Sequence, residues 1–169
     1  MVVRVRILFG VILFLLAIGS SAGEATQVDS DTLAFATYIS DVSRLDGMYH
    51  GLADFCRQYV PALILSQSDA AWHRNNGRYI DSIDLAIQRY ASAKVDAARR
   101  DQVVQQLKTN AQTWFQEAHD KSNVLSQVQI AEEKSTACSG MLGTMVSDSF
   151  YLKRMMPEDD AYWLKYLNP

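Results

Sequence analysis

The chain has 169 residues, of which 49% are hydrophobic and 21% are charged, and its formal net charge is −3. Its 8 glycines and 3 prolines are too few for the closely spaced turns of a β-sandwich, and its composition excludes a collagen-like or disordered chain. We therefore predict an all-α domain. The acidic balance argues against a nucleic-acid partner, because phosphate binding depends on clustered lysines and arginines.

Residues 1–22 have the features of a secretory signal peptide. Two arginines precede an almost wholly apolar stretch over residues 7–18, and small residues follow it. Cleavage after Ala22 or after Ala25 fits equally well. An uncleaved anchor is the alternative, but the uncharged stretch is shorter than the roughly 20 residues that span a bilayer. We expect an exported protein, periplasmic or extracellular, with one domain over residues 23–169 and no stable membrane anchor after cleavage.

The first long helix is predicted from apolar side chains at alternating spacings of four and three. It enters through Ser30 or Asp31 as N-cap and ends before Pro61, because proline disfavours helix in the residue before it. Gly47 and Gly51 weaken its middle by up to about 1 kcal/mol each relative to alanine, and they allow a bend or the close approach of a neighbouring backbone. The apolar stripe consists of Tyr38, Val42, Leu45, Tyr49, Leu52, Cys56 and Tyr59.

A second apolar stripe keeps its helical phase across the sequence Asn75-Asn76-Gly77. These three residues are also typical of a helix C-cap and turn, so two shorter helices are the alternative. Because a turn would preserve the phase only by chance, one helix, kinked at most, is favoured. The stripe consists of Leu65, Ser68, Trp72, Tyr79, Ile83, Ala86 and Tyr90.

Two further long helices are predicted over the C-terminal half, separated by a short polar turn at residues 120–123. Gly140 and Gly143 in the later helix are interpreted as close-packing positions. The apolar sides consist of Val103 or Val104, Leu107, Ala111, Trp114 or Phe115 and Ala118, and then of Val124, Val128, Ala131, Cys138, Leu142 and Met145.

The chain ends in a predicted short helix. Pro157 followed by three acidic residues is typical of a helix N-terminus, because proline fits the first turn and acids complement the helix dipole. The helix runs through Leu167, and we expect Trp163, Leu164 and Leu167 to pack on the bundle. The fold class is therefore an all-α bundle of four long helices plus a short C-terminal helix.

Cys56 and Cys138 are the only two cysteines, and they are predicted to form a disulfide. In an oxidising compartment two isolated thiols usually pair, and both lie on the apolar stripes of their helices. The enclosed loop of about 80 residues corresponds to on the order of 4–5 kcal/mol of stabilisation. A reactive or metal-binding thiol is the alternative, but neither cysteine lies in a C-x-x-C pair or has a histidine three or four residues away. The disulfide implies that the first and last long helices are neighbours.

No sequence motif identifies a catalytic residue, a metal site or a cofactor, and we expect none. The histidines at 50, 73 and 119 have no zinc-binding spacing, and no catalytic serine motif is present. Glu117–Asp120 would join a metal site only if another helix supplied ligands. A haem site with methionine and histidine ligands stays open, although methionines at helical spacing are more typical of a core. The methionines concerned are Met48, Met141, Met145, Met155 and Met156.

The densest group of side chains able to make directional contacts is Trp72, His73, Arg74, Asn75 and Asn76. Tryptophan and arginine dominate interface hot spots, so the segment is a candidate for binding a partner; an ordinary helix surface with Trp72 facing the core is the alternative.

Two functional hypotheses follow from the sequence. The first is a non-enzymatic exported protein that acts by binding another protein, as an inhibitor, immunity protein or accessory protein does. The second is a bundle that binds a small ligand or cofactor, or an enzyme, with its pocket between helices. A deep apolar cavity with convergent histidine or carboxylate groups would favour the second, and a solid core would argue against it.

Overall fold

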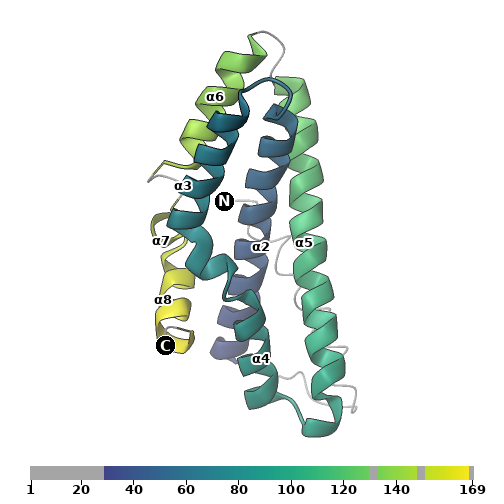
Figure 1. Cartoon of the computed structure of the whole chain (residues 1–169). Coiled ribbons are helices and arrows are strands. Elements are labelled where there is room, and N and C mark those ends of the chain that lie inside the picture. Colours follow the sequence, from purple (N-terminus) through teal and green to yellow (C-terminus); the bar gives the residue numbers. More distant parts are fainter. Residues whose placement is uncertain (1–28, 130–132, 148–150, 168–169) are drawn as a thin grey trace.

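The structure is a computed structural model that describes residues 29–129, 133–147 and 151–167, apart from the side chains of residues 125, 128 and 129. All of the regular structure in these residues is helical (Figure 1), as the composition predicts. Among them, no helix is both long enough and apolar enough to cross a membrane. The predicted signal peptide lies outside the described residues.

Two long helices, α2 and α5, lie side by side and form one half of the bundle (Figure 1). They run in the same direction, because Gly47 and Gly51 of α2 face Phe115 and His119 of α5 in that order. Helices α3, α6 and α8 cover the other side of α2. In chain order the elements are α2 (Ser30–Cys56), α3 (Ala62–Ile80), α4 (Ile83–Lys94), the 3₁₀ turn η1 (Ala97–Arg99), α5 (Arg100–Gln129), α6 (Lys134–Met145), α7 (Leu152–Met155) and α8 (Pro157–Tyr166).

Helix α2 is the core of the molecule and buries its predicted stripe. Its N-cap is Asp29, one or two residues before the predicted cap, because the Asp29 carboxylate accepts hydrogen bonds from the Thr32 backbone N–H (2.9 Å) and hydroxyl (3.0 Å). The helix ends at Cys56, so Tyr59 lies beyond it and is half-buried. The other six predicted stripe residues are buried.

Four of the helical glycines form two pairs with different surroundings. A Cβ added at Gly47 would overlap the backbone carbonyl of Phe115, and one added at Gly51 would overlap the carbonyl of His119. The predicted close approach at these positions is therefore confirmed. The close packing predicted at Gly140 and Gly143 in α6 is wrong, because a Cβ at either position would have nothing within 4 Å.

Helix α3 passes through Asn75–Gly77 without a break, as the phase of the stripe predicts. The single helix predicted across the whole stripe is wrong, because α3 ends at Ile80 and the chain turns at residues 81–82 before α4. At that point the Arg78 carbonyl accepts hydrogen bonds from the Ser82 hydroxyl (2.5 Å) and the Trp163 indole (3.0 Å). The Ser82 N–H bonds the Tyr79 carbonyl instead (3.2 Å). Two side chains thus bond the carbonyl that would continue the helix, and α4 begins at Ile83.

The turn predicted at residues 120–123 is wrong, because α5 continues through it to Gln129. Polar side chains support the helix there: Gln116 donates to Asp120 (2.7 Å), and the Ser122 hydroxyl donates to the Met48 carbonyl of α2 (2.8 Å). Val124 is 57% exposed, so it does not belong to an apolar stripe. The predicted stripe positions at 128 and 131 lie outside the described side chains.

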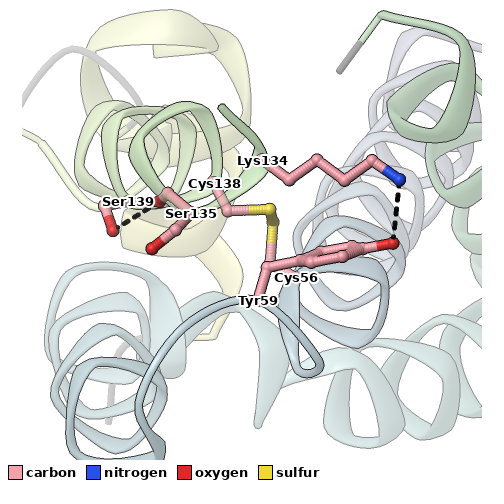
Figure 2. The surroundings of a disulfide bond; sticks show 6 residues. All are labelled: Cys56, Tyr59, Lys134, Ser135, Cys138 and Ser139. Atoms are coloured by element: carbon pink, nitrogen blue, oxygen red, sulfur yellow. Dashed lines mark hydrogen bonds between the residues drawn. A yellow bond between two sulfur atoms is a disulfide. The ribbon is translucent and has the colours of Figure 1, made fainter. Parts of the chain in front are cut away.

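The predicted disulfide between Cys56 and Cys138 is present and joins α2 to α6 (Figure 2). Its Cα atoms are 5.5 Å apart across a sequence separation of 82 residues. Beside it, the Lys134 ammonium group donates to the Tyr59 hydroxyl (3.3 Å) and lies 5.0 Å from the centre of that ring. The bond therefore fixes the first turns of α6 to the end of α2.

The closing helix α8 begins at Pro157, as predicted, and is held on α3 by Arg78. The Arg78 guanidinium bonds Asp160 (2.7 Å) and lies 4.7 Å from the centre of the Trp163 ring. Leu167 is buried, as expected, but Leu164 is 52% exposed, so its predicted packing on the bundle is wrong.

Candidate functional site

Three of the five residues in the predicted interaction segment form hydrogen bonds with residues outside α3. Trp72 is buried, stacks on Tyr49 with ring centres 4.5 Å apart, and donates through its indole N–H to Asp46 (2.9 Å). Asn75 donates to the carbonyl of Val146 (3.0 Å), and the buried Asn76 accepts from the backbone N–H of Leu152 (2.9 Å). These contacts fasten α3 to its neighbours.

His73 and Arg74 are the residues of this segment that face solvent. The His73 imidazole lies against Gly77 and 3.6 Å from the Asp81 carboxylate. Arg74 makes no ion pair within the part of the chain that the structure describes. The surface that this segment offers to a partner is therefore narrower than the sequence indicates, and the interaction hypothesis stays a prediction.

A cavity of about 940 Å³ lies between α2, α5 and α6. This volume lies near the upper end of the roughly 300–1,000 Å³ range of ligand pockets. Its walls are three faces of three helices, each contributing residues at helical spacing. They consist of Arg44, Met48 and Leu52 from α2, of Trp114, Glu117, Ala118, Lys121, Ser122 and Ser126 from α5, and of Ala137, Gly140, Met141, Thr144 and Met145 from α6.

The inner walls of the cavity are apolar. Leu52 and Met145 are buried, Trp114 and Met141 are half-buried, and Met48 is 43% exposed. Methionine is unbranched and polarisable, so it adapts to the shape of a bound molecule. The absence of a side chain at Gly140 also widens the space, because no atom occupies the position where its Cβ would lie.

Some polar groups of the cavity already have hydrogen-bond partners in the protein, and others do not. The Ser122 hydroxyl donates to the Met48 carbonyl (2.8 Å), and the Thr144 hydroxyl donates to the Gly140 carbonyl (2.9 Å). Three lining residues are charged: Arg44, Glu117 and Lys121. Among the described residues none of these three forms an ion pair, and the buried Nε of Arg44 has no hydrogen-bond partner.

The convergent groups expected of a cofactor or catalytic pocket are largely missing from this lining. It includes one carboxylate, Glu117, and none of the lining side chains identified is a histidine. Met48, Met141 and Met145 line the cavity without an imidazole among the described lining residues to complete the haem interpretation. Within the described residues, no three acidic, histidine or cysteine side chains form a group that could hold a metal ion.

The titratable groups whose pKa values are shifted are not among the residues that line the cavity. His119 bonds Asp54 (3.0 Å) and Asp120 (3.1 Å), and the two carboxylates, Asp54 first, raise the pKa of its imidazole. Burial raises the pKa of Asp159 to about 7, and the neighbouring Asp41 and Glu158 act in the same direction. Perturbed groups mark functional sites when they line a cleft. None of these groups lines the cavity described above.

Comparisons of the chain with family models, with curated proteins and with solved structures find no match. The geometry of the cavity is therefore the basis for inferring a function. Sequence reasoning singled out the three methionines of the lining and placed Leu52, Trp114 and Ala118 on apolar stripes, but it did not bring these residues together in one site. The signal that could have found the α2 wall is the spacing of Arg44, Met48 and Leu52, which places them on one helix face beside the buried stripe.

Proposed function

We propose that the protein is exported and binds an apolar small molecule in the cavity between α2, α5 and α6. The observation that carries the proposal is the cavity itself, about 940 Å³ in volume and walled by leucine, methionine and tryptophan side chains. Apolar surface in such a cavity gains about 25 cal/mol per Å² when a ligand covers it. The binding of an apolar molecule would therefore be favourable, because it covers this apolar surface.

The constraints on the three helices that form the walls favour an open cavity that binds a ligand over one that collapses. Helices α2 and α5 are in backbone contact at Gly47 and Gly51, and the disulfide ties α6 to α2. A cavity between constrained elements loses little conformational entropy when a ligand enters, which favours affinity.

Export is supported by the signal-peptide features of residues 1–22. The disulfide is consistent with an oxidising compartment. Intact mass of protein recovered from the periplasm or medium is expected to lack residues 1–22 or 1–25. A mass that includes Met1–Ala22 would contradict this part of the proposal.

Titration of the purified protein with the neutral apolar dye Nile red tests the cavity. We expect saturable one-to-one binding with a blue shift of the dye emission. The variant Gly140→Trp fills the cavity and should weaken binding at least tenfold, because Gly140 lines it. Gly143→Trp is the matched control, since Gly143 lies on the same helix and has equally free space at its Cβ but is not among the lining residues.

Equal dye affinity in the two variants would contradict the proposal, and so would the absence of saturable binding in the original chain. Circular dichroism and urea unfolding of both variants establish that each is folded. The comparison therefore separates loss of the cavity from loss of the fold.

A protein partner is the second candidate, and the exposed Arg74, with no ion pair among the described residues, is the observation that favours it. Arg74→Ala should release a partner captured from periplasm or culture supernatant, while Lys153→Ala, a similarly exposed cation, should not. Retention of the same partner by Arg74→Ala would count against this segment as the binding surface.

A further inference from the structure

The cavity is elongated along the helix axes. Its α5 wall extends from Trp114 to Ser126 and its α2 wall from Arg44 to Leu52, which correspond to about 18 Å and 12 Å at 1.5 Å per residue. A slot of this length with adaptable methionine walls suits an extended chain better than a compact ring system. The shape therefore points to a ligand with an alkyl-like body.

The charged residues that line the slot lie at different points along its length. Because Gly47 lies level with Phe115 and Gly51 with His119, Lys121 is level with the part of α2 about nine residues beyond Arg44, or about 13 Å along the axis. Lys121 shares its helix face with Glu117 one turn earlier, so the two charges partly offset each other. Arg44 stands at the other end of the slot.

Arg44 has unused hydrogen-bonding capacity. Its side chain is half-buried, its Nε is buried without a partner, and no described carboxylate is within ion-pair distance. The nearest acidic influence is Asp41 one turn earlier, whose pKa is raised by burial although the Arg44 charge acts to lower it. The guanidinium therefore offers several N–H donors at the end of an apolar slot.

We propose that the ligand is a single-chain amphiphile whose anionic head group lies against Arg44 and whose alkyl chain fills the slot. This inference rests on the proposed function. The guanidinium matches the two oxygens of a carboxylate, which accept two parallel hydrogen bonds from it. The Ser122 and Thr144 hydroxyls already donate to backbone carbonyls, so an uncharged head finds fewer free donors here. A cationic head would be repelled by Arg44.

Displacement of Nile red by twelve-carbon amphiphiles below their micelle concentrations tests the head group. Dodecanoate should bind at least tenfold more tightly than dodecanol, and dodecyltrimethylammonium should bind most weakly, because charge-assisted hydrogen bonds contribute on this scale. Arg44→Gln should remove the preference for dodecanoate over dodecanol, with both affinities compared within the variant and corrected for its own dye affinity. Arg44→Lys should retain part of the preference.

Two matched variants control for overall charge and for position. Lys153→Gln makes the same change in net charge at an exposed site on α7 and should have no effect. Lys121→Gln should reduce dodecanoate affinity less than Arg44→Gln does. A larger loss with Lys121→Gln would overturn the assignment of the head group to Arg44.

The outcomes also separate this inference from the proposed function. Equal affinity for dodecanoate and dodecanol, with the dye still bound in the cavity, would overturn the anionic head and leave the apolar site standing. Failure of every alkyl compound to displace bound dye would overturn the single-chain amphiphile alone. Absence of dye binding would overturn both.

Discussion

Two pairs of glycines, each spaced about one helical turn apart, lie in opposite environments. Gly47 and Gly51 belong to α2, and Gly140 and Gly143 belong to α6. The first pair brings the α5 backbone into contact with α2, so that no side chain fits between the two helices. The second pair faces open space, and Gly140 lines the cavity. The Gly47/Gly51 pair thus allows close backbone contact between α2 and α5, which we call the α2–α5 seam. The Gly140/Gly143 pair leaves open space next to α6.

The difference explains how a small bundle keeps a large cavity. The α2–α5 seam forms the rigid half of the molecule, while α6 is tied to α2 by a disulfide near its first turns (Figure 2). Because α6 is held by a covalent bond as well as by packing, it can stand away from α5. The cavity occupies the space that results.

The largest expected effect comes from removing the disulfide that holds the α6 wall. The double variant Cys56→Ala/Cys138→Ala should lose about 4 kcal/mol of unfolding free energy, as loop-closure entropy for 82 residues implies. It should also lose Nile red binding at urea concentrations where it is still folded. Urea unfolding followed by circular dichroism measures the first effect. Unchanged dye affinity would show that packing alone holds α6 in place.

The next largest loss of stability should come from adding a methyl group at either glycine of the α2–α5 contact. Gly47→Ala or Gly51→Ala forces a Cβ into the backbone of α5 and should destabilise the protein by about 3 kcal/mol. Thermal or urea unfolding gives the value. A loss below about 0.5 kcal/mol would mean that α2 and α5 separate easily, and would contradict the rigid seam.

The same substitution on α6 should have the opposite sign. Gly140→Ala and Gly143→Ala should each raise the unfolding free energy by about 0.5–1 kcal/mol, because alanine favours helix and meets no neighbouring atom. These variants serve as controls for the α2 pair. Destabilisation by either one would show that α6 packs more closely than described.

The seam should also respond weakly to pH through His119 of α5 and Asp54 of α2. The pKa of His119 is raised by Asp54 and Asp120, so the folded protein binds this proton more tightly than the unfolded chain does. The stabilisation is present below pH 6.5 and is lost as pH rises through the folded pKa. Since Asp54 is 45% exposed, we expect under about 1 kcal/mol.

A comparison with His119→Gln measures this contribution. The variant and the original chain should differ in unfolding free energy at pH 5.5 and converge at pH 8.5. A difference that grows with pH would contradict the assigned ion pair.

Much of the fold follows from local patterns in the sequence. The stripe of α2 predicts six of the sixteen buried residues of that helix, and the positions of Cys56 and Cys138 on apolar stripes predict their bond. The continuity of α3 through Asn75–Gly77 follows from phase. These features depend on side-chain spacing within one helix, which the sequence displays directly.

Other features depend on residues that meet only in the folded chain. The break after α3 arises where Trp163, far along the sequence, bonds the Arg78 carbonyl. The continuation of α5 through residues 120–123 depends partly on a contact from Ser122 to α2. The cavity is a gap between three helices, and no local pattern distinguishes a glycine at a seam from one beside a gap.

Methyl NMR of protein labelled at methionine is the most direct test of the cavity as a binding site. The methyl groups of Met48, Met141 and Met145 line the cavity, whereas Met155 and Met156 lie elsewhere and are internal controls. On addition of Nile red, the account predicts saturable shifts of the first three signals and none of the other two. Shifts confined to Met155 and Met156, or no saturable shift at the three cavity methionines, would contradict it.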